Sequence, residues 1–274
     1  MGTTVAPILG PGIGGYLDRC FGWQSVFAFL GAIGLVIFLI TWFDLGETVP
    51  LQTSRQNSQR VDYTELLKSQ RFWGYCVSSA LGSGSFFIYL SGAPFLGTEL
   101  FGLSPEQLGL YFGAPAQGYF AGNFISGHYS ERFGVDAMVI SGLNFTVSGT
   151  ALSLIVSASG NGSVLSFFGF MCFVGLGNGL TIPNATAGML SARPHLAGTT
   201  SGLGSAIMIG GGAALSALAG PVVSIDAGET PLLLIMETSA IFGFATMLLV
   251  LRRQRKLAKQ ECLATGPDKT QPHP

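Results

Sequence analysis

Long apolar segments separated by short polar connections dominate the hydrophobic pattern of the chain. Eight of these segments approach or reach the roughly 20 residues that an α-helix needs to cross about 30 Å of hydrocarbon. They are residues 3–17, 25–43, 72–96, 108–126, 137–157, 164–189, 198–223 and 231–251. Apolar and polar residues do not alternate within them, which disfavours transmembrane β-strands. The pattern therefore predicts an all-α polytopic membrane protein with about eight membrane-spanning helices.

The connections differ in length, and this difference predicts how the chain is divided. The connection 44–71 is long, polar and rich in Gln, Ser and Arg, whereas the others are short. We expect residues 1–43 to hold two helices of one unit, 44–71 to form a central cytoplasmic loop, and 72–251 to form a six-helix bundle. Residues 252–274 are expected to form a cytoplasmic tail that is disordered beyond Lys259.

The first apolar segment is short for a membrane span. At about 15 residues it would be about 22 Å long, less than the thickness of the hydrocarbon core. We therefore expect the chain to begin partway through a helix. The unit formed by residues 1–43 would then lack N-terminal helices, or would need a partner chain that supplies them.

Charge supports the membrane interpretation and predicts an orientation. Only 10% of residues are charged and 48% are hydrophobic, whereas soluble domains carry about 25% charged residues. With eight spans, both ends and every Lys and Arg except Arg19 fall on one side, which is the cytoplasmic side by the positive-inside rule. The net charge of −1 gives no reason to expect a nucleic-acid partner.

The stretch GPGIGG, residues 10–15, matches the dinucleotide-binding pattern G-x-G-x-x-G. That motif requires a preceding strand, a following helix and an acidic residue about 20 positions later. Pro11 occupies its second position, Asp18 is too close and Asp44 too distant. A helix-packing role is favoured, because glycines let another helix approach closely and Pro11 bends the helix.

Four motifs resemble those of the major facilitator superfamily, and in particular its bicyclomycin/chloramphenicol-type multidrug efflux family. Gly10, Pro11, Gly14 and Gly15 resemble the antiporter motif of the fifth helix, with Ala6 at its first glycine position. The other three are LGETVP (45–50), GHYSERFG (127–134) and FVGLGNGL (173–180). The second of these resembles a loop motif in which Gly127, Glu131, Arg132 and Gly134 take the motif positions; its final basic residue is absent.

The resemblance implies a partial major facilitator fold, about helices five to twelve. It also implies proton-coupled efflux of drugs or other small lipophilic molecules across the bacterial inner membrane. The partners would be the substrate, protons and the lipid bilayer. No cofactor is expected, because the proton gradient would supply the energy. Alternatives are a metabolite transporter for sugars or amino acids, and an inactive transporter fragment. No His, Asp, Glu and Ser constellation suggests a membrane enzyme, and the three histidines and four cysteines show no metal-ligand spacing.

Polar and aromatic residues inside the spans are the candidates for substrate contact, because polar groups in a membrane usually face a cavity or another helix. The corresponding helices imply a cavity lined by Phe86, Tyr89, Gln117 and Asn178. Phe87 and Tyr119 lie in the same spans, and Asn144 is a weaker candidate because its helix does not line the cavity in the family.

Two acidic residues have open alternatives. Glu237 is the acidic residue well inside a span, so it is either a proton relay or an interfacial or helix-pairing group. Glu131 could accept hydrogen bonds from a helix N-terminus and latch one conformation, or it could be a solvated charge. The glycines between Gly202 and Gly220 serve either helix sliding or static packing.

Overall fold

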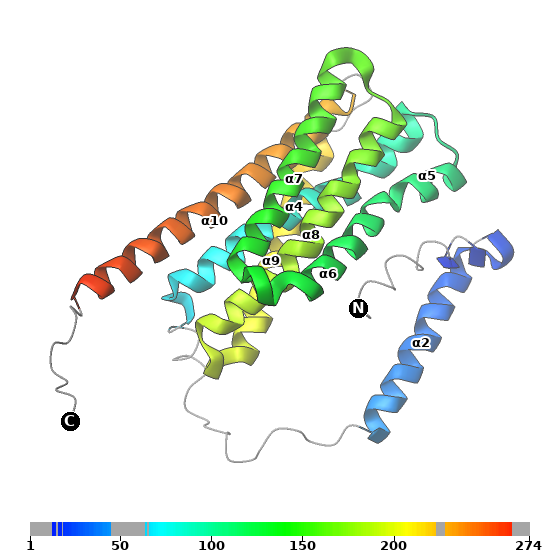
Figure 1. The fold of residues 1–274 in the computed structure, drawn as a ribbon. Coiled ribbons are helices and arrows are strands. Elements are labelled where there is room, and N and C mark those ends of the chain that lie inside the picture. Colours follow the sequence, from blue (N-terminus) through cyan, green and yellow to red (C-terminus); the bar gives the residue numbers. More distant parts are fainter. Residues whose placement is uncertain are drawn as a thin grey trace, which may run out of the picture.

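The computed structural model describes residues 13–14, 16–17, 19–44, 64, 66–222 and 228–264. Every regular element within these residues is a helix, which confirms the all-α prediction for the described part of the chain. Figure 1 shows long helices packed lengthwise, with one helix, α2, standing apart from the others.

The elements follow one another along the chain in a simple order. The α-helices are α2 (Trp23–Asp44), α4 (Gln70–Phe95), α5 (Pro105–Phe112), α6 (Ala114–Phe133), α7 (Val135–Val156), α8 (Val164–Ala192), α9 (Ala197–Ala219) and α10 (Thr230–Ala264). Short π- or 3₁₀-helical segments join them: η2 (Leu96–Leu100), η3 (Ser157–Asn161), η4 (Pro194–Leu196) and η5 (Gly220–Val222). These elements correspond to the second through eighth predicted spans, whereas most of the first span, 3–17, lies outside the described residues.

Five helical stretches are long and apolar enough to cross a membrane by length and composition. They are Trp23–Asp44, Val135–Asn161, Val164–Ala192, Pro194–Ala219 and Thr230–Gln254. Helix α4 is also long enough, at 26 residues, but contains several serines and glycines. Many of these small residues are buried against other helices. They do not face lipid, so their low hydropathy does not prevent α4 from lying in the membrane.

The fourth predicted span, 108–126, is interrupted and longer than expected. Helix α5 begins at a capping box between Ser104 and Gln107 and ends at Gly113. Helix α6 then begins at Ala114, with Pro115 in its first turn, because proline has no backbone N–H to continue the hydrogen-bond ladder of α5. Helix α6 continues to Phe133, seven residues beyond the predicted end.

The prediction that the tail is unstructured beyond Lys259 is wrong for its first residues, because α10 runs on to Ala264. The segment that follows Leu251 reads RRQRKLAKQECLA and contains neither Gly nor Pro. Arg, Lys, Gln, Leu and Ala are all good helix formers, so the helix extends past the apolar part. Residues 265–274 lie outside the described part of the chain.

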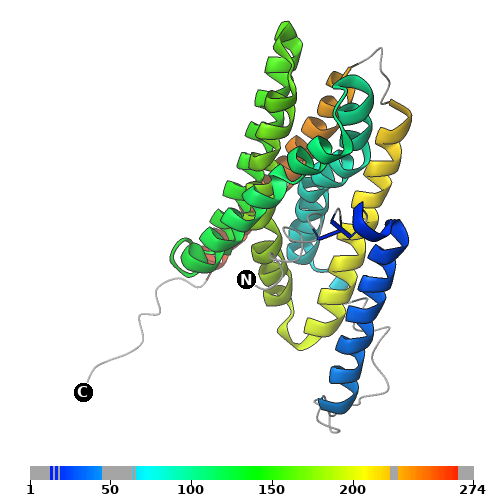
Figure 2. The ribbon, with the colours of Figure 1, turned by 90° about the vertical axis from the view of Figure 1, so that its right-hand side faces the viewer.

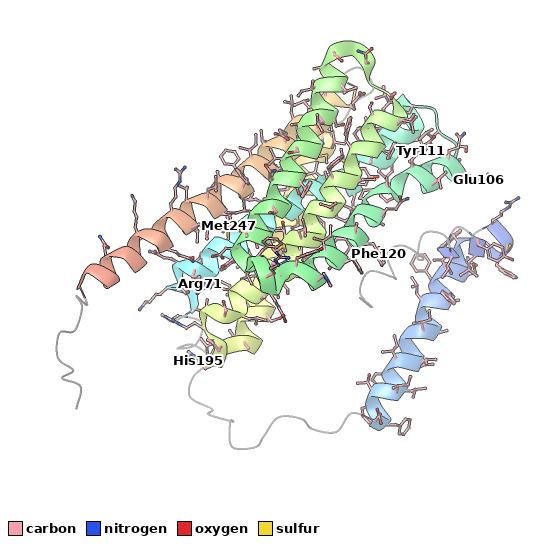
Figure 3. All side chains as sticks on the ribbon, in the orientation of Figure 1. Arg71, Glu106, Tyr111, Phe120, His195 and Met247 are labelled. Carbon is pink, nitrogen blue, oxygen red and sulfur yellow. The ribbon has the colours of Figure 1, made fainter. Side chains whose placement is uncertain are left out.

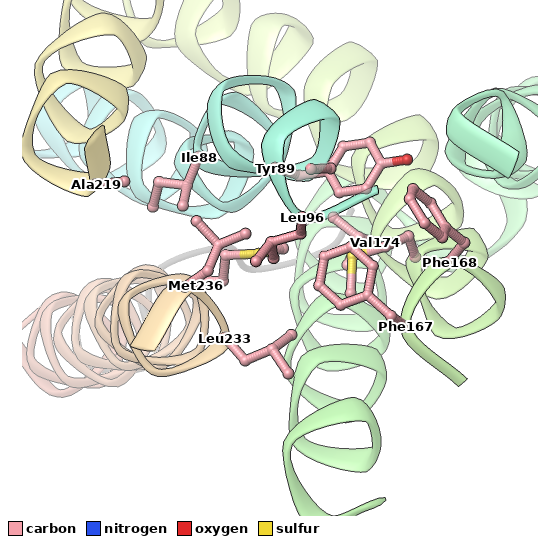
Figure 4. Close-up of a cluster of buried hydrophobic side chains, with 12 residues drawn as sticks. Ile88, Tyr89, Leu96, Phe167, Phe168, Val174, Ala219, Leu233 and Met236 are labelled. Atoms are coloured by element: carbon pink, nitrogen blue, oxygen red, sulfur yellow. The ribbon is translucent and has the colours of Figure 1, made fainter. Parts of the chain in front are cut away.

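Helix α4 is at the centre of the bundle. From the side, it lies between α9 (yellow) and α7 (green) (Figure 2), and it packs on α8, α9 and α10. One buried apolar cluster surrounds Tyr89, Phe168 and Met236, and part of it is drawn in Figure 4. A second surrounds Tyr75, Val139 and Met247. Serine hydroxyls also connect α4 to α10: Ser85 Oγ donates to the Met236 carbonyl at 2.8 Å, and Ser239 Oγ donates to the Leu81 carbonyl at 2.7 Å.

Helices α6 and α8 approach each other backbone to backbone through four glycines. A Cβ atom on Gly118 or Gly122 would overlap a carbonyl oxygen of α8, and one on Gly175 or Gly179 would overlap a carbonyl oxygen of α6. Each pair is spaced four residues apart and therefore lies on one helix face. Such small-residue faces permit the close packing that holds helices together in lipid.

Helix α2 has no buried residue. Arg19, just before it, lies 3.9 Å from Glu106 next to the bundle, but both side chains are at least 80% exposed, so this ion pair contributes little. The expected division of the chain at residues 1–43, 44–71, 72–251 and 252–274 remains a prediction.

The two ends of the bundle differ in charge. Apart from Arg19, the basic residues whose side chains are described lie at the end where α4 begins and α6 and α8 finish. They are Lys68, Arg71, Arg132, Arg193, Arg252, Arg253 and Lys256. Glu99, Glu106 and Glu229 lie at the other end, whereas Glu131 and Asp136 lie at the same end as the basic residues. Figure 3 labels Arg71 and His195 toward the basic end, and Glu106 toward the acidic one.

Candidate functional site

A cavity of about 270 Å³ opens between α4, α6, α8 and α9. Its lining is aromatic and aliphatic with few polar groups. The lining residues are Ser83, Phe86, Phe87, Pro115, Ala116, Tyr119, Gly175, Asn178, Ile182 and Met208. None of these side chains is charged.

Helix α4 supplies one wall through Ser83, Phe86 and Phe87, whose i, i+3, i+4 spacing places them on one helix face. Tyr89, predicted to line the cavity, does not. It is fully buried in the apolar cluster, where its ring stacks on Phe112. Its hydroxyl donates a hydrogen bond to the Phe112 carbonyl at 3.1 Å. Figure 4 labels Tyr89 beside Phe168 in this cluster. Tyr89 is therefore satisfied by the protein itself.

Helix α6 supplies the opposite wall through Pro115, Ala116 and Tyr119. Gln117, also predicted to line the cavity, is exposed outside it. Positions two apart on an α-helix point about 200° away from each other, so Gln117 faces away from the side that Pro115 and Tyr119 share. Tyr119, the aromatic candidate on the same span, lines the cavity.

Asn178 on α8 is the predicted residue with the most distinctive setting. It lies between Gly175 and Ile182 in the cavity wall and is 3% exposed. Its Oδ1 atom is buried and has no hydrogen-bond partner among the described residues. A buried amide oxygen without a partner is costly in a folded protein, which distinguishes Asn178 from the other polar residues of the cavity wall.

The cavity brings together two of the four predicted contacts, Phe86 and Asn178. Phe87 and Tyr119 were recognisable as aromatic residues of the same spans. Met208 and Pro115 gave no functional signal in the sequence, because an isolated methionine or proline in an apolar helix has the same appearance whether it faces lipid, a neighbour or a cavity.

Glu237 lies outside this cavity, on α10. Its carboxylate accepts a hydrogen bond from the Thr150 hydroxyl of α7. This contact is the helix-pairing arrangement that the sequence left open beside a proton relay.

The loop motif, residues 127–134, is mostly helical. Gly127, Glu131 and Arg132 belong to the last turns of α6, and Gly134 makes the turn to α7 with a φ of 82°, a conformation that favours glycine. Glu131 is exposed and forms no hydrogen bond with a described residue, and Arg132 lies 5.6 Å from the centre of the Phe133 ring. The latch predicted for Glu131 stays a prediction.

Another acidic residue near this junction contacts the bundle. Asp136, in the first turn of α7, accepts a hydrogen bond from the hydroxyl of Tyr75 on α4.

In the motif at the beginning of the chain, Gly10, Pro11 and Gly15 lie outside the described residues. Gly14 is half-buried, and a Cβ atom there would lie 4.0 Å from Val26.

Comparison with known proteins identifies relatives over most of the chain. The chain is 30% identical over 199 residues to the chloramphenicol resistance protein of Pseudomonas aeruginosa, which is 71% of this chain and 46% of that protein. It is 23% identical over 220 residues to the bicyclomycin resistance protein homolog of Haemophilus influenzae (78% and 54%). It is 26% identical over 247 residues to multidrug resistance protein D of Escherichia coli (85% and 59%). The chain thus spans about half the length of these curated relatives, whose names agree with the resemblance to the bicyclomycin/chloramphenicol-type family.

A solved structure supports the fold. The crystal structure of a bacterial homolog of the human lysosomal transporter Spinster, in an inward-facing and occupied conformation, matches with a TM-score of 0.54 at 16% identity. The match covers 91% of this chain and 66% of that one. The sequence-family model that describes the Major Facilitator Superfamily matches residues 1–217 of this chain. The packed helices and the extent of this match together show that the chain, a multi-pass membrane protein, belongs to the Major Facilitator Superfamily.

Proposed function

We propose that the chain contributes to proton-coupled export of drugs or other small lipophilic molecules across the bacterial inner membrane. The cavity between α4, α6, α8 and α9 would be its part of the substrate site. Major facilitators rock two helical units around a site near the middle of the membrane, and this cavity lies among the helices that would line such a site.

The observation that carries the proposal is the lining of the cavity. Phe86, Phe87, Ile182 and Met208 offer apolar and aromatic surface, which binds flat lipophilic molecules by stacking and burial. The unpartnered Oδ1 of Asn178 would accept one hydrogen bond from an N–H or O–H of the substrate and so orient it.

The same lining argues against the alternative of a sugar or amino-acid transporter. A sugar needs several hydrogen-bonding side chains, and a zwitterionic amino acid needs charged partners. Ser83, Tyr119 and Asn178 are the polar side chains of the described cavity wall. A lipophilic substrate leaves fewer of its polar groups unpaired there.

Proton coupling is proposed from the family resemblance rather than from the cavity. An ionisable group is needed to carry the proton, and no described cavity residue is acidic or basic. The coupling groups would therefore lie elsewhere. In the resembled family they lie largely in the first half of the transporter.

The substrate proposal can be tested with two asparagine variants. Asn178→Leu removes the unpartnered oxygen of the cavity, whereas Asn144→Leu, on the exposed surface of α7, makes the same chemical change outside it. Binding of radiolabelled chloramphenicol would be measured on the purified chain in detergent. Drug susceptibility would be measured in cells that express the gene. We expect Asn178→Leu to weaken binding about tenfold, the effect of losing one hydrogen bond of about 1.4 kcal/mol, and Asn144→Leu to leave it unchanged.

Two outcomes would contradict the proposal. Saturable binding of a sugar or an amino acid, with no binding of lipophilic drugs, would favour the metabolite transporter. Equal effects of the two asparagine variants would remove the cavity from the substrate site.

A further inference from the structure

A second and larger groove, of about 640 Å³, lies on the outside of the bundle between the start of α4 and α10. It is separate from the cavity described above, which is formed by the other side of α4 with α6, α8 and α9. Figure 3 labels Arg71, which lies at this groove where α4 begins.

The walls of the groove are apolar. Trp73 and Val77 line it from α4, and Leu249 and Val250 line it from α10. The two helices meet closely at Gly74, where a Cβ atom would overlap the side chain of Val250, and this contact closes the floor. The indole Nε1 of Trp73 donates to the Leu67 carbonyl at 2.8 Å, which fixes the ring in the wall.

The rim of the groove is cationic. Lys68 and Arg71 stand on one side and Arg253 on the other, and all three are exposed. None of them forms an ion pair with a carboxylate of the described part of the chain. Arg71 additionally lies 5.9 Å from the centre of the ring of Tyr75, whose hydroxyl donates to Asp136.

The cations lie at the depth where a lipid headgroup would be. Helix α10 is uncharged from Thr238 to Leu251 and basic from Arg252 onward, so Arg253 marks the end of the hydrocarbon region. Trp73, which is 36% exposed, is a side chain typical of this interface. An apolar groove that ends in three cations without an ion-pair partner among the described residues matches the chemistry of an anionic phospholipid.

We infer that the groove between α4 and α10 binds one anionic glycerophospholipid, with its acyl chain along Trp73, Val77 and Leu249 and its phosphate between Lys68, Arg71 and Arg253. A zwitterionic lipid has the same acyl chains, but its headgroup carries no net charge to balance the three cations. This site requires only that the chain sits in a bilayer, so it does not depend on the proposed transport of drugs.

Trp73 itself can report occupancy. The chain has three tryptophans, and the exposed Trp23 and Trp42 of α2 can be replaced by Phe to leave Trp73 as the single fluorophore. The variant would be reconstituted into phosphatidylcholine vesicles with increasing fractions of phosphatidylglycerol or phosphatidylcholine carrying brominated acyl chains, which quench tryptophan on contact. We expect half-maximal quenching at a severalfold lower fraction of brominated phosphatidylglycerol than of brominated phosphatidylcholine.

The matched variants are Arg253→Gln and Arg252→Gln. They remove the same charge from neighbouring exposed positions of α10, but Arg253 lines the groove and Arg252 does not. We expect Arg253→Gln to raise the half-quenching fraction of phosphatidylglycerol about fivefold, which corresponds to about 1 kcal/mol per basic residue at an anionic surface. Lys68→Gln, on the other wall, should do the same, whereas Arg252→Gln should leave it nearly unchanged.

Three results would overturn the inference. Equal quenching by the two brominated lipids would show that the groove does not select charge. Equal effects of Arg252→Gln and Arg253→Gln would show that the preference for anionic lipid comes from general attraction to the membrane surface and not from the groove. Relief of quenching by soluble glycerol phosphate would identify a phosphate site that makes no use of the apolar walls.

Discussion

Asn178 and Tyr89 are both polar, both buried and both on helices that border the cavity, yet their hydrogen bonding differs. The Tyr89 hydroxyl donates to the Phe112 carbonyl, whereas Oδ1 of Asn178 has no partner among the described residues. A satisfied buried group contributes to stability, and an unsatisfied one costs stability unless a ligand completes it. Tyr89 and Asn178 should therefore respond to substitution in opposite ways.

Tyr89→Phe is expected to destabilise the protein without changing ligand binding. The substitution leaves the Phe112 carbonyl without its side-chain donor, at a cost of about 1 kcal/mol, and keeps the ring stacking. Thermal unfolding of the solubilised chain should occur a few degrees lower. Asn178→Leu should unfold at the same temperature as the original chain or slightly higher. If Tyr89→Phe instead lost ligand binding without losing stability, Tyr89 would have to contact the ligand in the cavity.

Glu237 can be tested as a helix-pairing group and as a proton relay in one pair of variants. Gln at this position still accepts a hydrogen bond from Thr150, so Glu237→Gln should keep the stability of the chain. Glu237→Leu should lose about 0.6–1.7 kcal/mol, the range for interhelical hydrogen bonds in membranes. Thermal unfolding measures both, and proton-driven efflux in inverted vesicles tests the relay. Full proton coupling in Glu237→Gln would exclude the relay, and its loss in a stable variant would support it.

At the scale of elements, glycines bring α8 close to both α6 and α7. Gly118 and Gly122 face Gly175 and Gly179 between α6 and α8, and Gly142 of α7 meets Gly177 of α8. On α9, by contrast, Gly202 and Gly210 have open space around them, as does Gly220 in η5, and Gly204 and Gly212 meet the side chains of Met189 and Phe87. Static close packing therefore accounts for the α6–α8 glycines, and for only some of those on α9.

Gly179→Val and Gly169→Val separate packing from helix propensity. Both positions are in α8, but a side chain at 179 would collide with the backbone of α6, whereas 169 is exposed with nothing within 4 Å. We expect Gly179→Val to lose about 1–3 kcal/mol or more through overpacking and to unfold several degrees lower. Gly169→Val should change the unfolding temperature by no more than about 2 °C. Similar losses in both variants would contradict close packing of α6 on α8.

At the scale of the whole molecule, the arrangement of helices gathers the basic residues at one end. Lys68 and Arg71 precede or begin α4, and Arg252 and Arg253 follow the apolar part of α10. Their separation from the acidic end, with Glu99 and Glu229, agrees in sense with the positive-inside rule. We propose on this basis that the basic end faces the cytoplasm.

Cysteine labelling of intact cells tests this orientation. The four native cysteines would be replaced by alanine, and Asn161→Cys or Ala197→Cys introduced at exposed positions on opposite ends of the bundle. A membrane-impermeant maleimide should label Asn161→Cys in intact cells and Ala197→Cys only after the membrane is opened. The reverse pattern would invert the topology and would place the lipid groove in the outer leaflet.

The sequence by itself determined the helical membrane fold, the segregation of charge and the positions of the helices from residue 25 onward, except for the break between α5 and α6 and the extension of α10. These features follow from local composition: an apolar run long enough to cross a bilayer must be helical to satisfy its backbone, and cations are kept at the membrane surface. It also pointed to Phe86 and Asn178, which line the described cavity, because polar and aromatic residues in such a run are unusual.

The tertiary structure alone decided which way each side chain points. Gln117 and Tyr119 lie in the same span, and only the position of α8 beside α6 makes one of them face a cavity. Similarly, Glu237 looks the same in sequence whether it carries a proton or pairs with Thr150. In an all-round apolar helix the hydrophobic pattern has no polar face to fix its rotation, so the rotation is set by the neighbours against which the helix packs.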